Sequence, residues 1–351
     1  MNDQLGLARA RTLTIGGVTT AALTLAAVFL PVPYVVEMPG PTLDVLGSAD
    51  GVELIGVPEA PDHPVTGQLR LTTVRTRGSD RDLTVGEAAV SWISAADQVI
   101  PYDAAYPKAS TKQEREERSA QQMVSSQELA SVAALGALGL GVELRIVDAL
   151  PGPAAEVLKP DDVLVSIDGT MVRDFEHLLR VLSAIPAGST ITVAIRRSGQ
   201  SEEVTLRTLD DGAGGSRMGV TVGFALPVDV EFGIEGIGGS SAGAMFALGI
   251  VDKLGEVDLA AGRIVAGTGT VDPYGNIGPI GGIQQKMVGA RRDGAEFFLA
   301  PRDNCPQVLG SIPPGLTVAA VATLNDALDA LSAMRSGDLS DLATCDSLPN
   351  S

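Results

Sequence analysis

Histidine is almost absent from this chain of 351 residues, which contains only His63 and His177. In α/β-hydrolases the catalytic order is serine, acid, histidine. Both histidines here precede the candidate nucleophile Ser241, so no histidine triad of that order exists. The reverse order, with His63 as the base, would require a separate module to interrupt the catalytic fold, and we discount it. We expect His63 in an exposed loop and His177 in an exposed first helical turn, and a contact between His177 and a ligand is the alternative.

Cysteine is equally scarce, with Cys305 and Cys345 alone. Two cysteines and two scattered histidines do not provide the four ligands of a structural zinc site, so we expect no metal and no cofactor. Outside the cytoplasm, a Cys305–Cys345 disulfide is expected, and closing such a loop would stabilise the fold by roughly 3 to 5 kcal/mol. With the opposite orientation, two free buried thiols remain the alternative.

Positively charged residues are few: the sequence has 25 Lys and Arg against 43 Asp and Glu, which gives a net charge of −18. Nucleic acid is therefore not expected as a partner, since clustered Lys and Arg dominate phosphate binding. The sequence also contains no G-x-x-x-x-G-K-[ST] phosphate loop, so the chain has no ATPase of its own. An enzyme without an unfolding motor is expected to act on chains that are already extended.

Charged residues are missing from Thr12 to Val36, a span of 25 positions (36 − 12 + 1). About 20 apolar residues cross the ~30 Å hydrocarbon core of a bilayer, so residues 12–36 are predicted to form a transmembrane helix. Arg9 and Arg11 place residues 1–11 in the cytoplasm and the bulk of the chain outside the cell membrane. A cleaved signal peptide is the alternative, but its apolar core is usually ~7 to 15 residues long.

A glycine-flanked serine turn is present. Gly239-Ser240-Ser241-Ala242-Gly243 fits G-x-S-x-G, and the apolar run after it is typical of a helix. The serine would then lie in the first turn, where free N–H groups and the positive end of the helix dipole can stabilise an oxyanion. Gly239 and Ala242 are the candidate donors.

Lysine is the remaining base. Of the five lysines only Lys253 and Lys286 follow Ser241. Lys253 is expected at the end of the helix that begins near Ser241, about 18 Å away at ~1.5 Å per residue. Lys286 shares a helical stripe with Ile283, Met287 and Ala290, where burial would favour the neutral amine. A stem lying on apolar surface with its head in water is the alternative.

The coarse pattern predicts a multidomain α/β (α+β) protein. After the anchor, residues 37–125 show short β-like runs and then a charged helix. Residues 126–209 show a β-rich pattern with a helix near 176–185, and Gly and Asp make residues 210–216 a flexible link. Strands and helices alternate over residues 217–345.

Taken together, several sequence blocks resemble the proteolytic domain of Lon-type serine peptidases. Residues 126–209 resemble a PDZ domain, and the chain from about 9 to 345 is similar to bacterial membrane-anchored PDZ proteins with a Lon-like domain. This resemblance implies that Ser241 is the nucleophile, Lys286 the base and Thr268 a residue that holds the lysine. The chain departs from classical Lon peptidases at Gly238, where they have an acid, and at Ser240, where they have proline. The blocks are Gly239 to Gly243, Thr268-Gly269-Thr270-Val271, Gly278-Pro279-Ile280-Gly281-Gly282 and Lys286.

The resemblance implies an ATP-independent endopeptidase that cuts extended or loosely folded protein substrates outside the cytoplasm. A PDZ domain adds a peptide strand to a sheet edge, and we expect its groove between the Val142 strand and the Glu176 helix. Lon-like domains often form hexamers, so a homo-oligomer is expected. The alternative is a membrane-tethered PDZ scaffold that has lost catalysis, and Gly238 is the residue that favours it.

Overall fold

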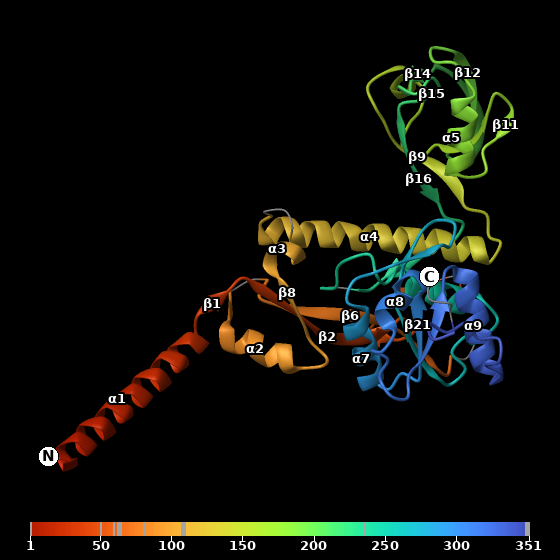
Figure 1. Ribbon diagram of the computed structural model, residues 1–351. Coiled ribbons are helices and arrows are strands. Elements are labelled where there is room, and N and C mark those ends of the chain that lie inside the picture. The colour runs from red at the N-terminus through yellow and green to blue at the C-terminus, as the bar shows by residue number, and fades with distance from the viewer. Residues whose placement is uncertain are drawn as a thin grey trace.

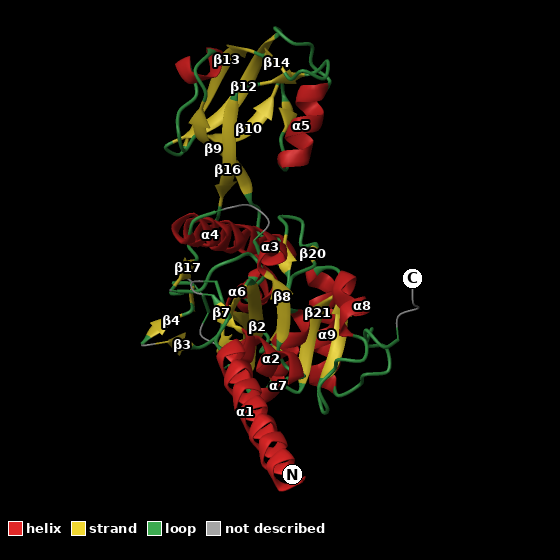
Figure 2. Ribbon diagram, turned by 60° about the vertical axis from the view of Figure 1, so that its left-hand side comes forward, coloured by secondary structure: helices red, strands yellow, loops and turns green. Residues whose placement is uncertain are grey.

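The computed structural model describes residues 2–49, 51–58, 60–61, 65–79, 82–106, 110–234 and 236–347, without the side chains of residues 2–12 and 49. His63 lies outside these residues. Figures 1 and 2 show a larger mixed α/β body, a smaller β-rich body beyond helix α4, and a single helix, α1, that projects from the larger body.

Helix α1 (Asn2–Val28) exposes its apolar side chains, with Leu13 76% and Leu25 64% accessible. In the part of the chain that the structure describes, no helix is both long enough and apolar enough to cross a membrane. The uncharged stretch 12–36, predicted as one transmembrane helix, is instead divided. Prolines at 31 and 33 disfavour helix, and strands β1 (Pro31–Val32) and β2 (Tyr34–Asp44) follow α1.

The larger body is built on a six-stranded sheet in the order β22-β21-β18-β6-β2-β8. The first four strands are parallel, and β2 pairs antiparallel with both β6 and β8. Strand β21 is buried at all five positions, as expected for a parallel strand covered on both faces. The strands are β6 (Gln68–Arg77), β8 (Gln98–Pro101), β18 (Ile264–Gly267), β21 (Phe297–Pro301) and β22 (Thr317–Val321).

Helix α6 (Gly243–Leu254) forms the centre of this body, with ten of its twelve residues buried. It packs against β6 and against the long helix α4 (Lys112–Ala137), which crosses the body in Figure 1. A capping box of Thr111 and Glu114 begins α4, which satisfies backbone groups at its N-terminus. The other helices are α2 (Val85–Ile93), α3 (Tyr102–Ala105), α7 (Ile283–Arg292), η2 (Arg302–Asn304), α8 (Cys305–Val308) and α9 (Leu324–Ser336).

Short strand pairs complete the larger body. Strand β7 pairs with β1, β4 with β3, β17 with β5, and β20 with β19. The β19–β20 hairpin follows directly after Thr268 and Gly269, so it lies next to the site described below. The pairs involve β3 (Ser48–Ala49), β4 (Val52–Glu53), β5 (Ile55–Gly56), β7 (Leu83–Thr84), β17 (Glu231–Phe232), β19 (Thr270–Val271) and β20 (Ile277–Gly278).

The larger body does not begin at residue 217, where the sequence pattern placed its start. Strands β2 and β6 come from the segment 37–125, which we expected to be separate, and they lie in the middle of the sheet. Leu71 of β6 pairs with Gly267 of β18, almost 200 residues later in the chain. The smaller body is therefore an insertion between α4 and β17.

The smaller body contains a sheet in the order β13-β12-β10-β9-β16, with β11 paired to β10. The fully buried Ile146, Ile167 and Ile195 belong to its core. Its elements are β9 (Glu143–Ala149), η1 (Pro153–Glu156), β10 (Val163–Ile167), β11 (Thr170–Met171), α5 (Phe175–Ser183), β12 (Thr190–Arg197), β13 (Gln200–Arg207), β14 (Leu209–Asp210), β15 (Ser216–Arg217) and β16 (Val220–Ala225).

Two predictions about this body need correction. The predicted link at 210–216 lies inside it, because β14 pairs with β15 and β16 then pairs along β9. The peptide groove was predicted beside the Val142 strand, but β9, which begins one residue later, is paired on both edges. The outer strand on that side is β16. It joins the sheet by pairing with β9, which lies some 75 residues earlier in the chain.

Candidate active site

Ser241 lies in the turn that leads into α6. Gly239 makes the turn with φ of +90°, a conformation that residues with a Cβ rarely adopt, and Ala242 is the N-cap residue of the helix. Ser241 is half-buried and lines a cavity of about 480 Å³. Lys286 of α7, Glu37 of β2 and residues 71–76 of β6 line the same cavity.

Lys286 reaches this cavity from the first turns of α7. The helix begins after Gly282, and the lysine side chain is only 3% exposed, so its head does not reach water. Lys286 Nζ lies 2.7 Å from Ser241 Oγ and 2.8 Å from Thr268 Oγ1. The two residues are 45 positions apart in sequence, and the parallel sheet brings their helices together.

Thr268 connects the lysine to the serine turn. Its hydroxyl donates a hydrogen bond to the backbone carbonyl of Ser241 at 2.9 Å. A hydroxyl has one proton to donate, so Thr268 Oγ1 must accept from Lys286 Nζ. One amine hydrogen then points at Thr268, which leaves the lone pair of a neutral amine free to face Ser241 Oγ. Gly269 N–H also donates to the Ser241 carbonyl, at 2.9 Å, which holds the turn in place.

The electrostatics of the cavity favour the neutral lysine. Burial lowers the pKa of Lys286 from 10.5 to about 7, and the nearby Glu37 carboxylate opposes this shift. Burial also raises the pKa of Glu37, and its attraction to Lys286 lowers it again in part. Near neutral pH a substantial share of Lys286 is therefore unprotonated and able to act as a base.

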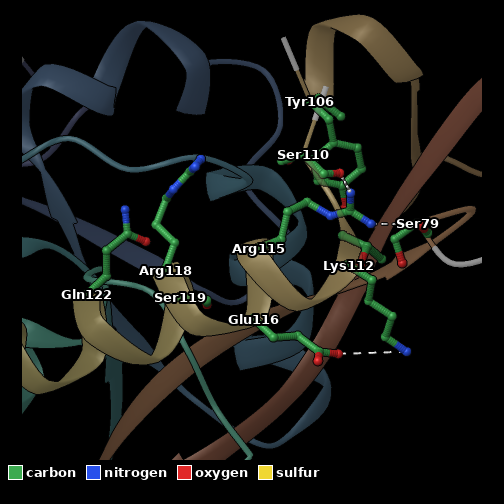
Figure 3. A pocket seen from close by; sticks show the side chains of 11 residues that line it. Ser79, Tyr106, Ser110, Lys112, Arg115, Glu116, Arg118, Ser119 and Gln122 are labelled. Carbon is green, nitrogen blue, oxygen red and sulfur yellow. Dashed lines mark hydrogen bonds and ion pairs between the residues drawn. The ribbon is translucent and has the colours of Figure 1, made fainter. Parts of the chain in front are cut away.

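The turn does not offer all the N–H groups that the sequence predicted for an oxyanion. Gly239 N–H donates to the backbone carbonyl of Ser119 in α4 at 2.9 Å, so this donor is already used. Within the described residues, the N–H group of Ala242 has no hydrogen-bond acceptor. Ala242 N–H thus remains a donor, whereas in the first turn of α6 Ala244 N–H already donates to the Gly269 carbonyl at 3.0 Å. Ser119 also lines a neighbouring cavity (Figure 3).

Gly238, the departure from classical Lon peptidases, has a steric cause. A Cβ at position 238 would lie 2.0 Å from Ser119 Oγ and 2.9 Å from Ser119 Cβ. Such approaches are too close for any side chain, so α4 occupies the space that an acidic residue would need. Within the described residues, Glu37 of β2 contributes a carboxylate to this cavity.

The other candidates lie apart from this pair. Lys253 forms an ion pair with Glu53 at 2.7 Å at the far end of α6. Ser240 lines a different cavity, and its carbonyl accepts a hydrogen bond from Ser126 of α4. His177 of α5 is half-buried with an Nδ1 that has no partner among the described residues, so the expectation of an exposed side chain was wrong.

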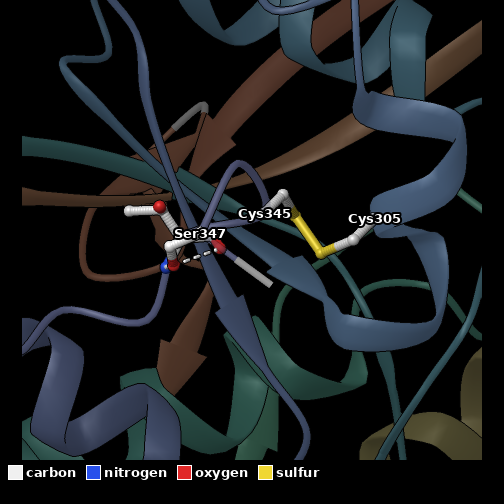
Figure 4. Close-up of a disulfide and its surroundings, with 4 residues drawn as sticks. Cys305, Cys345 and Ser347 are labelled. Carbon is white, nitrogen blue, oxygen red and sulfur yellow. Dashed lines mark hydrogen bonds between the residues drawn. A yellow bond between two sulfur atoms is a disulfide. The ribbon is translucent and has the colours of Figure 1, made fainter. Parts of the chain in front are cut away.

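Cys305 and Cys345 form a disulfide that ties the C-terminal segment to α8 (Figure 4). Both residues are buried, and the closed loop spans 40 positions. Next to the disulfide, residues 343–345 pair with β22 through Ala320 N–H to Ala343 O and Cys345 N–H to Val318 O. The disulfide lies outside the catalytic cavity.

Sequence reasoning missed Glu37 and Ser119. Glu37 lies in the segment for which the sequence showed only short β-like runs, and the pairing of β2 with β6 brings it to the site. In the described part of the chain, no group of three or more His, Cys, Asp or Glu residues is placed to hold a metal ion.

Two protein-family models match the chain. One is described as a PDZ domain and matches residues 127–208, and the other is described as the Lon protease (S16) C-terminal proteolytic domain and matches residues 227–333. The chain is thus a mixed α/β multidomain protein that carries a PDZ domain and a Lon-type proteolytic domain. The second match contains Ser241, Thr268 and Lys286, but neither match contains β2, β6 or β16.

Lon proteases are among the curated relatives that the chain matches. The chain is 33% identical over 93 residues to the Lon protease of Azospirillum brasilense and 34% identical over 94 residues to Lon protease 1 of Bacillus subtilis. Each match covers 26% of this chain, which spans only 11% and 12% of those relatives. Among solved structures, the PDZ domain of an SdrC-like protein from Listeria monocytogenes aligns with 19% identity over 23% of this chain and 86% of its own, with a TM-score of 0.22.

Proposed function

We propose that this protein is a serine endopeptidase in which Ser241 is the nucleophile and Lys286 the general base. The observation that carries the proposal is the 2.7 Å distance between Lys286 Nζ and Ser241 Oγ, made by a lysine that is 3% exposed. A buried amine with a pKa of about 7 can accept the proton of a serine hydroxyl near neutral pH.

Acylation follows from this geometry. Neutral Lys286 takes the hydroxyl proton of Ser241 while Oγ attacks the peptide carbonyl carbon. The oxyanion that forms is stabilised by Ala242 N–H and the N-terminal end of α6. The lysine ammonium then gives its proton to the leaving amine, the C–N bond breaks, and Ser241 carries the acyl group. Glu37 attracts the ammonium while it exists.

Deacylation reverses the roles with water. Lys286, neutral again, removes a proton from a water molecule that attacks the acyl carbonyl. The second tetrahedral intermediate collapses, the lysine returns its proton to Ser241 Oγ, and the new carboxylate leaves. Thr268 keeps the amine oriented through both halves of the cycle, because its hydroxyl accepts one lysine hydrogen throughout.

The substrates are proposed to be extended or loosely folded polypeptides. A cavity of about 480 Å³ accommodates a few side chains and not a folded domain. The sequence contains no phosphate loop, which supports cleavage without ATP. The PDZ domain would hold a substrate segment by strand addition at the outer edge of β16.

We also propose that α1 anchors the protein at the cell membrane, with the catalytic body on the extracytoplasmic side. The exposed apolar side chains from Leu13 to Val28 support a lipid contact, and the Cys305–Cys345 disulfide supports an oxidising compartment. Fractionation of cells that produce the full chain, followed by protease treatment from the outside, tests this placement. Recovery of the chain in the soluble cytoplasmic fraction would contradict it.

The catalytic proposal is tested with three variants and one unfolded substrate, such as reduced casein. Ser241→Ala and Lys286→Ala should abolish cleavage, whereas Ser240→Ala should retain it, because Ser240 makes no contact with the lysine. Equal activity in all three variants refutes the assignment. A serine-directed acylating probe should label the wild-type chain at Ser241 and fail to label Lys286→Ala.

A scaffold without catalysis is the competing function. In the sequence, this alternative was supported by Gly238, which stands where classical Lon peptidases have an acidic residue. The contact of Ser119 with position 238 accounts for this glycine by packing, and the serine–lysine pair is geometrically complete without it. We therefore favour the enzyme.

A further inference from the structure

A cavity of about 630 Å³ lies beside the catalytic cavity (Figure 3). Its walls are the N-terminal half of α4 and parts of the chain between Thr76 and Ser110. Thr76 lines both cavities, and Ser119, which lines the larger one, accepts the hydrogen bond of Gly239 N–H. A polypeptide bound across Ser241 can therefore extend a neighbouring side chain into this space.

Most of the charges in the larger cavity are already engaged. Lys112 lies 3.7 Å from Glu116. Arg115 donates to the carbonyls of Ser110 at 2.6 Å and Ser79 at 3.2 Å, and its guanidinium lies 4.7 Å from the centre of the Tyr106 ring. Arg115 is thus a structural residue that holds the wall of the cavity.

Arg118 differs from these residues. It is exposed. Among the residues that the structure describes, its guanidinium interacts electrostatically with the Glu114 carboxylate, one turn earlier in α4, without a direct hydrogen bond or ion pair. It lines this cavity and also the cavity beside Ser240. Figure 3 shows its side chain extending into the open part of the cavity, away from Arg115. Arg118 is thus an exposed cation at the wall of this cavity, in a chain with a net charge of −18.

We propose that this cavity is a specificity subsite, the basic subsite (Arg118, Ser119 and Gln122), which receives an acidic side chain of the polypeptide held at Ser241. Arg118 forms the ion pair with the substrate carboxylate. The polar side chains of Ser119 and Gln122, which also line the cavity, donate hydrogen bonds to the same carboxylate. The inference rests on the proposed peptidase function and names the substrate class: chains with Asp or Glu near the scissile bond.

A side chain of a bound polypeptide fits this site better than a free anion. One exposed ion pair contributes at most about 1 kcal/mol, which is too little to hold a small anion alone. The same pair can discriminate between substrates once the catalytic cavity holds the chain, because the cost of association has already been met. Thr76, which lines both cavities, provides that continuity.

The experiment uses the full chain and fluorogenic decapeptides of mixed sequence that differ at one position, which is Glu, Gln or Lys. The position is moved along both sides of the cleaved bond, and kcat/KM is measured for each peptide. We expect Glu at one position to exceed Gln by about fivefold and Lys by more. Arg118→Gln should abolish this preference, and Arg118→Glu should reverse it so that Lys is favoured.

Arg335→Glu is the matched control, because Arg335 is exposed on α9 and lines none of the cavities described above. It makes the same charge change and should leave the preference intact. A wild-type preference for Glu that survives Arg118→Gln, or no charge preference at all, overturns the subsite while leaving the peptidase intact. No cleavage of any peptide, with no probe labelling at Ser241, overturns both proposals.

A lipid headgroup is the other anionic occupant to exclude. Vesicles with 30% phosphatidylserine and neutral vesicles are compared for binding of wild type and Arg118→Glu. Loss of binding to the anionic vesicles in Arg118→Glu, together with unchanged peptide preferences, would assign Arg118 to the membrane surface and overturn the subsite.

Discussion

At the residue scale, the function depends on which way one amine points. Thr268 gives its proton to the Ser241 carbonyl and so can only accept from Lys286, which leaves the lysine lone pair free to face Ser241 Oγ. Burial keeps the amine neutral, and the hydrogen bond keeps it aligned. Neither effect alone would make Lys286 an efficient base.

Removing the Thr268 hydroxyl should therefore slow catalysis without unfolding the protein. Thr268→Val keeps the volume and removes the acceptor, so kcat should fall on the order of 10-fold or more, with little change in KM. Thr268→Ser keeps the hydroxyl and should retain most of the activity. Steady-state kinetics on one peptide check this, and equal kcat in Val and Ser variants would contradict the orienting role.

Glu37 should set the acid limb of the pH profile. Its negative charge favours the ammonium form of Lys286 and so raises the lysine pKa, against the larger effect of burial. Glu37→Gln removes that charge, so the pKa of Lys286 should fall further. The rise of kcat/KM with pH should then begin at lower pH than in the wild type. An unchanged or higher midpoint would show that Glu37 does not act on the lysine.

At the scale of elements, α4 determines the shape of the serine turn. Its Ser119 accepts the Gly239 N–H and fills the space beside Gly238, and its Ser126 donates to the Ser240 carbonyl. The turn is therefore held from outside by a helix that precedes the smaller body, and the turn sequence alone does not reveal it.

Gly238→Ala tests this packing. The new Cβ would meet Ser119 Oγ and Cβ, so the variant should lose about 1 to 3 kcal/mol of unfolding free energy. In a Ser119→Gly background most of the clash is gone, and the cost of Gly238→Ala should be smaller by about 1 kcal/mol or more. Denaturant unfolding of the four proteins in this cycle gives the coupling. Strictly additive effects would contradict the contact.

Local patterns allowed part of this site to be predicted. Ser241 stands out by its glycine neighbours and Lys286 by an apolar helical stripe, because both signals extend over fewer than ten residues. The place of Glu37 in the site and the engagement of the Gly239 N–H could not be predicted in this way, whereas Ala242 was among the expected donors. The position of Glu37 depends on the pairing of β2 with β6 and of β6 with β18. The Gly239 N–H donates to the carbonyl of Ser119, 120 positions earlier in the chain. Pairings at such separations leave no periodic trace in one sequence.

At the scale of the whole molecule, the PDZ domain is an insertion in the catalytic body. Strands β2, β6 and β8 precede it, and α6, α7 and the other parallel strands follow it. Assembly of the catalytic body therefore needs both halves of the chain, and the PDZ sheet closes separately through β16. Assembly into a hexamer stays a prediction.

Fragments should reflect this arrangement. A fragment of residues 217–351 lacks half of the six-stranded sheet and leaves β18 as an exposed edge, so it should not unfold cooperatively. A fragment of residues 138–228 contains the complete PDZ sheet with β16 and should melt in one transition. Thermal unfolding followed by circular dichroism distinguishes them. A cooperative transition for 217–351 would contradict the shared sheet.

The central claim is that a buried, largely neutral amine activates the serine, and a direct titration of Lys286 tests it. The chain has five lysines, so 13C labelling at lysine Cε gives a short NMR spectrum that can be followed with pH. One resonance should titrate with a pKa of about 7 and disappear in Lys286→Met. If the resonance that disappears in Lys286→Met titrates near 10.5, Lys286 is charged at neutral pH and cannot be the base.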